Sequence, residues 1–255
     1  MKGRVVSLVV LGVVFWAFVV GESYGADPQT VQLGKTVYER RCAFCHGLKG
    51  DGKGTAEFVS KKKDGKIWKI YPRDFTFGSF RFRSTQTGSL PTDADLMNIL
   101  SRGIPRSSMP AGRDLSDQEK MAVIQYIKTF SARWKDEQPG TAITVTAKPG
   151  WVGSPESVAK GEQVWKNMKC WECHGEKGRG DGTKSETIKD DMKRAILPFD
   201  FTVGALKRGN TPEDIYLAYT TGLDGTGMPS YEDSLNEDDR WHLVSFTQKL
   251  MGLVK

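Results

Sequence analysis

The four cysteines of the chain fall into two clusters, and a histidine directly follows each cluster. The clusters are Cys42-Ala43-Phe44-Cys45-His46 and Cys170-Trp171-Glu172-Cys173-His174. Cysteines at positions i and i+3 share one face of a helical turn, so both thiols of a pair can form thioether bonds to the two vinyl groups of one porphyrin. The histidine that follows then directs its imidazole at the iron as proximal ligand. The spacing therefore predicts two covalently bound haem c groups.

Cysteine pairs with this spacing also occur in redox dithiols, structural disulfides and zinc sites. A thioredoxin-like dithiol needs a βαβ context, which this sequence lacks, and it does not require histidine at the next position. A zinc site needs four ligands close together, whereas the two clusters lie more than a hundred residues apart. Because both clusters end in histidine and together use every cysteine, haem attachment accounts best for the pattern.

The elements that must position these residues form an internal repeat. A helical turn with a glycine and an aromatic residue four positions apart precedes each cluster, and a glycine-rich turn follows it. Further along, a Pro-x-Asp-Phe-Thr segment occurs in both halves. The matching residues are Gly34 and Tyr38 with Gly161 and Trp165, and the matching segments are 72–76 and 198–202.

Two further helices are predicted in each half, a short one and a final amphipathic one. Capping residues mark where they begin, and glycines end the short ones. Between the halves, the chain from Asp136 to Pro155 is rich in Pro, Gly and Thr and has no helical period. The expected N-caps are Thr92, Ser116, Thr211 and Asn236, and the expected stops are Gly103 and Gly222.

A Met-Pro pair lies six residues after the stopping glycine in each half, at Met109-Pro110 and Met228-Pro229. The identical register predicts Met109 and Met228 as the sixth ligands of the two irons, opposite His46 and His174. Thioether sulfur favours reduced iron, so the prediction is a pair of low-spin haems of comparatively high potential.

Other residues compete for the role of sixth ligand. Met97 and Met121 lie in helical patterns, where methionine usually fills the core, and Met192 and Met251 have no counterpart in the other half. His242 is the alternative ligand, but it lies inside the last predicted helix and has no counterpart either. A surface or core histidine is the preferred interpretation of His242.

The composition fits a soluble globular protein, with 38% hydrophobic and 27% charged residues, and its net charge of +6 does not by itself indicate nucleic-acid binding. The N-terminus differs from the rest. Lys2 and Arg4 precede an apolar run from Val5 to Val20 and then small residues, which is typical of a signal peptide. The run is only slightly shorter than a membrane span, so an uncleaved anchor is the alternative. Either implies a periplasmic or otherwise exported protein.

With these residues in place, the chain resembles the class I cytochromes c, as a tandem dihaem member. The resemblance implies an all-α fold of two cytochrome c domains, in which an N-terminal helix crosses a C-terminal helix beside each haem. It divides the chain into a signal peptide or anchor at 1–26, domain 1 at 27–135, a linker at 136–149 and domain 2 at 150–255. The implied haem-binding residues are Cys42, Cys45, His46, Met109, Cys170, Cys173, His174 and Met228.

Several basic and proline residues have roles that the sequence leaves open. Arg73, Arg81 and Arg83 either pair with haem propionates or lie at the surface. Five lysines between positions 61 and 69 form either a solvated face or a docking site for an acidic partner or an anionic membrane. We expect each proximal imidazole to donate its other N–H to a backbone carbonyl, and Pro72 and Pro198 are candidates to supply it.

The function that the resemblance implies is electron transfer between exported or membrane-bound respiratory redox partners, with no catalytic residue. The partners would be a donor and an acceptor protein, and no nucleic acid. Two alternatives remain: a dihaem cytochrome c peroxidase-like enzyme, and a permanent electron-wire subunit of a larger oxidoreductase complex. The peroxidase needs an iron with an open position, which the paired Met-Pro motifs disfavour.

Overall fold

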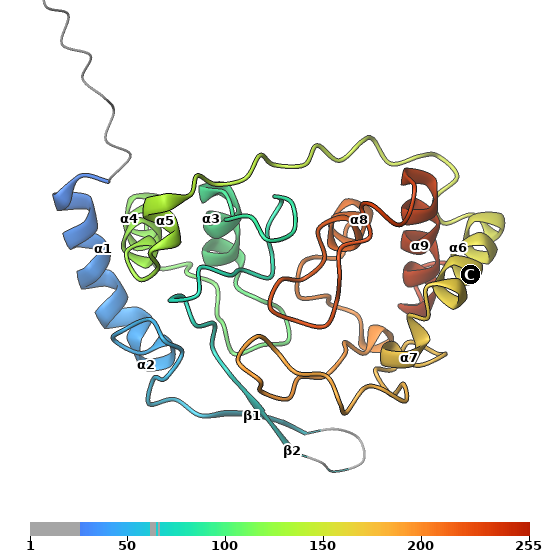
Figure 1. The fold of residues 1–255 in the computed structure, drawn as a ribbon, viewed down its shortest axis with the longest axis horizontal. Coiled ribbons are helices and arrows are strands. Elements are labelled where there is room, and N and C mark those ends of the chain that lie inside the picture. The colour runs from blue at the N-terminus through green and yellow to red at the C-terminus, as the bar shows by residue number, and fades with distance from the viewer. Residues whose placement is uncertain (1–25, 62–64, 66) are drawn as a thin grey trace, which may run out of the picture.

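The computed structural model describes residues 26–61, 65 and 67–255, and its helices form two groups that follow the two halves of the sequence (Figure 1). The predicted signal or anchor segment lies outside the described residues except for Ala26. In the described part of the chain, no helix is long and apolar enough to cross a bilayer. The first group contains α1 (Pro28–Arg41), α2 (Ala43–His46), α3 (Asp93–Arg102), α4 (Asp117–Lys128) and α5 (Arg133–Asp136). The second contains α6 (Pro155–Asn167), α7 (Trp171–His174), the 3-10 helix η1 (Phe201–Val203), α8 (Pro212–Thr221) and α9 (Glu237–Leu250).

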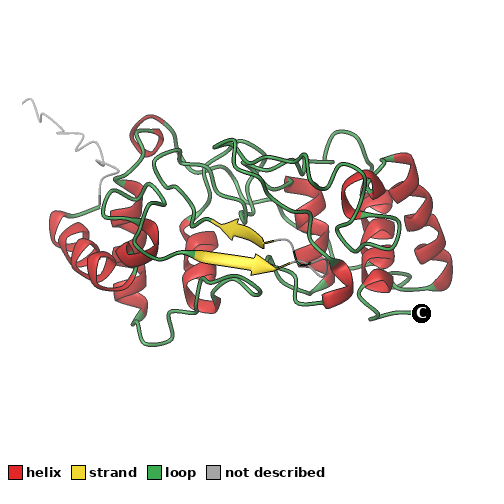
Figure 2. Cartoon of the chain, turned by 90° about the horizontal axis from the view of Figure 1, so that it is seen from below, coloured by secondary structure: helices red, strands yellow, loops and turns green. Residues whose placement is uncertain are grey.

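The predicted all-α class is confirmed, with a small addition in the first half. Strands β1 (Phe58–Lys61) and β2 (Ile67–Ile70) pair as an antiparallel hairpin, with Phe58 opposite Ile70. The hairpin lies in the long interval between His46 and Met109. Lys61 and Lys69 lie in its strands, whereas Lys62, Lys63 and Lys66 lie outside the described residues. One group of helices lies toward each end of the elongated molecule (Figure 2), and the hairpin runs along one edge of it (Figure 1).

In each half, the first helix crosses the long C-terminal helix at a glycine, α1 over α4 and α6 over α9. A Cβ added to Gly34 on α1 would lie 2.0 Å from the Ala122 carbonyl oxygen on α4. A Cβ added to Gly161 on α6 would likewise lie 2.0 Å from the His242 carbonyl oxygen on α9. Only glycine permits so close an approach of two backbones, so the expected helix crossing is confirmed in both halves.

Aromatic side chains fill the crossing one turn after the glycine. In the first half, Tyr38 contacts Tyr126 and Phe130, with ring centroids 5.3 and 5.2 Å apart. In the second, Trp165 lies edge-on to Phe246 at 5.5 Å. Tyr38 and Trp165 are both buried, and the Tyr38 hydroxyl donates to the Gly47 carbonyl at 2.8 Å. The packed helix pair therefore connects directly to the turn that follows the first cysteine cluster.

The predicted helix boundaries agree with the structure because the capping chemistry is local. The side chains of all four expected N-caps accept a hydrogen bond from the backbone of the first helical turn. Thr92, Ser116 and Thr211 do so within reciprocal capping boxes, and Asn236 accepts from Asp239 at 2.8 Å. Gly103 and Gly222 cap the C-terminal ends of α3 and α8 with positive φ, as expected.

The connection from α5 to α6 runs in an extended form along one side of the molecule (Figure 1). Its first part is bound to the first half of the chain. The Gly140 amide donates to the Leu90 carbonyl at 3.1 Å, and the Ile143 amide donates to the Ser84 carbonyl at 2.8 Å. Part of the connection is therefore fixed by backbone hydrogen bonds despite its lack of a helical period.

Candidate functional site

Each cysteine pair lies where a long helix ends and a short one begins. The Cys42 amide donates to the Tyr38 carbonyl at 2.8 Å, and the His46 amide donates to the Cys42 carbonyl at 2.9 Å. The His174 amide makes the same bond to the Cys170 carbonyl, at 2.9 Å. This helical turn places both thiols of a pair on one face. All four cysteines are free in the structure, so neither pair forms a disulfide.

The surroundings of the cysteines disfavour the dithiol and zinc interpretations. Burial raises the pKa of Cys42 to about 11 and that of Cys170 to about 11, which keeps both thiols neutral. A reactive dithiol needs a thiolate. Among the residues that the structure describes, no group of three His, Cys, Asp or Glu side chains lies close enough together to hold a metal ion. A neutral thioether to a porphyrin suits these buried positions.

The imidazole of each motif histidine is fixed by one hydrogen bond. His46 Nδ1 lies 3.0 Å from the Arg73 carbonyl oxygen, and His174 Nδ1 lies 3.2 Å from the Phe199 carbonyl oxygen. A carbonyl only accepts, so Nδ1 carries the proton and Nε2 keeps a free lone pair. Burial lowers the pKa of both histidines, which favours the neutral ring that can bind iron.

The expected bond to a backbone carbonyl is thus confirmed, but Pro72 and Pro198 do not supply it. Their carbonyl oxygens face the glycine-rich turns instead, at 2.8 and 2.7 Å from the positions of added Cβ atoms on Gly52 and Gly180. Successive carbonyls of an extended chain point in opposite directions. The next carbonyl in each half, that of Arg73 or Phe199, therefore faces the histidine.

The Pro-x-Asp-Phe-Thr segments that carry these carbonyls are held in the same way in both halves. Asp74 accepts hydrogen bonds from the amide and the hydroxyl of Thr76, at 2.9 and 2.6 Å, and Asp200 and Thr202 repeat both distances. The phenylalanine of each segment packs on the motif histidine. Ring centroids of His46 and Phe75 are 4.5 Å apart, and those of His174 and Phe201 are 4.8 Å apart.

Each predicted methionine ligand lies at the end of a six-residue loop, and the two loops have the same backbone hydrogen bond. In the first half the Ile104 amide donates to the Met109 carbonyl at 3.0 Å, and in the second the Leu223 amide donates to the Met228 carbonyl at 3.1 Å. Met109 packs against the buried core of the first half and Met228 against that of the second. The two loops therefore present their methionines in matching ways.

A hydroxyl two residues before each methionine braces the loop, and the sequence reasoning missed it. The Met109 amide donates to Ser107 Oγ at 3.1 Å, and the Met228 amide donates to Thr226 Oγ1 at 3.1 Å. Each hydroxyl also donates to the carbonyl that begins the loop, at 2.8 Å for Ser107 and 2.7 Å for Thr226. The sequence did contain a signal for this contact, because a Ser or Thr lies two positions before the methionine of each Met-Pro pair.

The ring of His242 is engaged elsewhere. Its Nδ1 lies 2.9 Å from Ser157 Oγ, and its ring centroid is 4.4 Å from that of Trp151. Its backbone carbonyl faces Gly161 at the helix crossing, the place that Ala122 takes in the first half. His242 therefore has a structural environment at the junction of α6 and α9.

The arginines singled out in the sequence lie between the two halves. Arg73 pairs with Asp191 at 3.0 Å, Arg81 with Asp190 at 3.7 Å, and Arg83 with Asp224 at 2.9 Å. The side chain of Arg83 is 0% exposed, so it is not a surface residue.

Several buried guanidinium atoms in the same region lack a hydrogen-bond partner within the described structure: Arg81 Nε, Arg83 Nη1, Arg102 Nε and Arg208 Nη1. Burial lowers the pKa of Arg81 to about 10 and that of Arg208 to about 10. Buried cationic donors of this kind call for an anionic acceptor. The carboxylates of two porphyrins are acceptors of the required type, so the residues present fit covalently bound haem.

Comparison with known proteins gives matches to both halves. The family model described as cytochrome c oxidase, cbb3-type, subunit III matches residues 29–127, and the model described as cytochrome c matches residues 158–250. Among solved structures, a chain of the reducing HAO-like protein complex of Kuenenia stuttgartiensis is 36% identical, with a TM-score of 0.79. The match covers 88% of this chain and 96% of that chain. No curated protein matches.

Proposed function

We propose that this chain, which belongs to the cytochrome c family and carries two of its domains in tandem, transfers electrons between redox partner proteins. Each domain binds one haem c covalently. When bound, each haem supplies an iron that takes up and releases one electron. The observation that carries the proposal is the matched pair of loops that present Met109 and Met228.

The protein's own residues hold the two sites in a closed form. In each domain the imidazole with its fixed Nδ1 proton and free Nε2 provides one ligand, and the braced methionine provides the other. These two side chains would hold the iron of a bound haem and would leave a small substrate no place on it. Soft, neutral sulfur ligands favour the reduced state, so both potentials are comparatively high. This arrangement suits an electron carrier and disfavours a peroxidase.

Spectroscopy of the holoprotein tests the ligands. The ferric protein is expected to be low-spin at both haems and to show a methionine-to-iron charge-transfer band. Met109→Ala and Met228→Ala should each remove part of this band and lower the potential of one haem, whereas Met251→Leu should change neither. A high-spin, peroxide-reactive haem in the unaltered protein would overturn the carrier proposal in favour of the peroxidase alternative.

The partners are proposed to be respiratory oxidoreductases outside the cytoplasm. The protein would be exported to them by its N-terminal signal peptide or held near them by an N-terminal anchor. N-terminal sequencing of the purified protein tests this, since cleavage should leave a chain that begins near residue 26, and recovery from the cytoplasmic fraction would contradict it.

The related chain belongs to a protein complex, and this favours a stably bound subunit as a second candidate. Gel filtration of native extracts separates the two forms, because a free shuttle elutes alone.

A further inference from the structure

The methionine loop of the second domain, residues 223–228, is contacted by the first domain through Asp224, a residue that the repeat does not match in the first domain. The corresponding loop of the first domain, residues 104–109, carries Pro105 where the second carries Asp224. A proline side chain has no polar group, so it cannot make the bonds that Asp224 makes. The asymmetry distinguishes two otherwise matching ligand loops.

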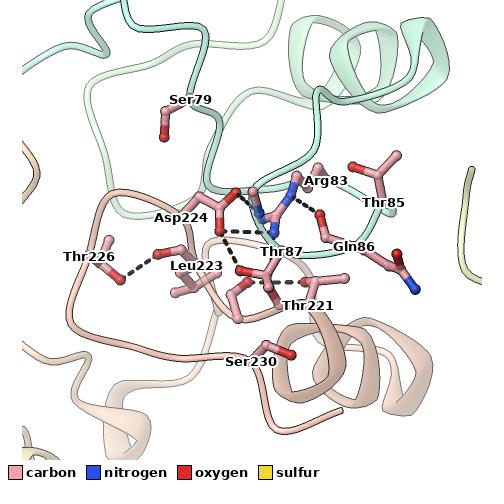
Figure 3. Close-up of polar contacts among 12 residues, drawn as sticks. Ser79, Arg83, Thr85, Gln86, Thr87, Thr221, Leu223, Asp224, Thr226 and Ser230 are labelled. Atoms are coloured by element: carbon pink, nitrogen blue, oxygen red, sulfur yellow. Dashed lines mark hydrogen bonds and ion pairs between the residues drawn. The ribbon is translucent and has the colours of Figure 1, made fainter. Parts of the chain in front are cut away.

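The first point of contact is the carboxylate of Asp224 (Figure 3). Three donors from the first domain reach it: Arg83 Nη2 at 2.9 Å, Thr87 Oγ1 at 2.9 Å and the Gly88 amide at 2.9 Å. Arg83 Nη2 also donates to the carbonyl of Thr221, the last residue of α8, at 3.1 Å. One buried guanidinium therefore holds both the end of α8 and the loop that follows it.

The second point of contact is Asp191, which lies before the loop in the second domain. Its carboxylate accepts from Arg73 Nη2 at 3.0 Å, and its backbone amide donates to the Gly225 carbonyl at 3.2 Å. The backbone carbonyl of Arg73 is the one that fixes His46. Through Arg73 and Asp191, the proximal histidine of the first domain is thus connected to the methionine loop of the second.

The burial of these groups makes the contact strong. The Arg83 side chain is 0% exposed and that of Asp224 is 15% exposed, while those of Arg73 and Asp191 are 14% and 22% exposed. Charges withdrawn from water interact more strongly with each other and are poorly screened by salt. Loss of one partner leaves the other charge buried and uncompensated. The loop therefore cannot swing away from its place without breaking these pairs.

We propose that Arg83 and Asp224, together with Arg73 and Asp191, form an interdomain clamp that keeps Met228 on the second haem. The clamp makes ligation in the second domain depend on the first domain. The loop of Met109 carries Pro105 where the second loop carries Asp224, and proline cannot make the same bonds. All four are positioning residues, because they act on Met228 through the backbone of its loop. The inference rests on the proposed His/Met ligation of both haems.

Imidazole, which competes for the place of the methionine, provides the probe. Its binding to the ferric holoprotein is followed by stopped-flow absorbance, and the Met109→Ala and Met228→Ala variants assign each kinetic phase to one haem. Asp224→Asn, which keeps the size of the side chain but removes its charge, should accelerate binding at the second haem at least tenfold and leave the first unchanged. Thr87→Val, an exposed substitution in the first domain, should accelerate the same phase about fivefold.

Two controls keep the outcomes distinct. Asp233→Asn removes the same charge from an exposed position of the second domain, and it should leave both phases at the rate of the unaltered protein. Arg83→Lys keeps the charge but loses the forked donors, so it should accelerate the second-haem phase less than Asp224→Asn does. The circular dichroism melt of each variant checks that the domain remains folded under the conditions of the assay.

Each result then bears on one proposal. If Met228→Ala leaves the charge-transfer band and the binding phases unchanged, the proposed ligation is wrong. If Met228→Ala acts as expected but Asp224→Asn and Thr87→Val bind imidazole at the original rate, or accelerate both haems equally, the clamp is refuted and the ligation stands.

Discussion

The glycine at the crossing of α6 and α9 gives the sharpest test of the packing. Gly161→Ala adds a Cβ that would lie 2.0 Å from the His242 carbonyl oxygen, 2.6 Å from its carbonyl carbon and 2.9 Å from Phe246 Cβ. The two nearest atoms belong to the backbone and cannot rotate away. Reaching an ordinary contact of 3.4 Å requires the helices to separate by about 1.4 Å there. That movement also disturbs the edge contact between Trp165 and Phe246.

The size of the effect follows from two opposing terms. Overpacking of a filled site costs typically 1–3 kcal/mol, and rigid backbone neighbours place this case near the upper end, at about 3 kcal/mol. Alanine is favoured over glycine inside a helix by about 1 kcal/mol. The expected net loss in the free energy of unfolding is about 2 kcal/mol. For a domain of this size, that lowers the melting temperature by roughly 10 °C.

Differential scanning calorimetry of the holoprotein measures the effect, and the repeat supplies a partner variant. Gly34→Ala should lower the transition of the first domain in the same way, because its Cβ would meet the Ala122 carbonyl oxygen at 2.0 Å. Gly150→Ala is the control, since nothing lies within 4 Å of its added Cβ, and it should stay within about 0.5 kcal/mol of the original. An unchanged or raised melting temperature in Gly161→Ala would refute the close helix crossing.

Three further outcomes are expected from the caps and the braced loops. Ser107→Ala removes the hydroxyl that accepts from the Met109 amide, a loss of about 1 kcal/mol, and should speed imidazole binding at the first haem about fivefold in stopped-flow measurements. Thr211→Ala removes the cap of α8 and should cost about 1 kcal/mol in the free energy of unfolding, measured in guanidinium. Bonds from the backbone and side chain of Ser116 lower the pKa of Glu119, so its stabilising effect is complete above its unfolded pKa and is lost as pH falls through the lowered folded value. A melting temperature of Glu119→Gln that runs parallel to that of the original protein across this acidic range would contradict the last expectation.

Features that depend on neighbouring residues were accessible from the sequence. The cysteine and histidine spacing, the N-caps and the stopping glycines act within a turn or two of the chain, so periodicity and residue type identify them. The repeat added longer-range information. Met109 and Met228 occur at the same position in both halves, and this distinguishes them from the other methionines. It also contained the hydroxyls of Ser107 and Thr226, which went unnoticed because Ser and Thr are common in loops.

The direction of a carbonyl and the pairing of distant side chains were not accessible in this way. Proline at 72 and 198 marked the right segments, but the alternation of the extended chain makes the next carbonyl the acceptor for the histidine. The hairpin between Phe58 and Ile70 likewise lies in an interval for which the sequence predicted no strand.

By itself, the sequence determined that this protein has two cytochrome c domains, each with a cysteine pair, a histidine directly after it and a methionine in matching register. Only the tertiary structure decided how the domains meet. Arg83 and Asp224 are 141 positions apart, and their charges become a clamp only because folding brings them together at one boundary that is largely shielded from water. A carboxylate in a loop is ordinary when solvated; enclosed by three donors from another domain, it fixes the loop that presents Met228.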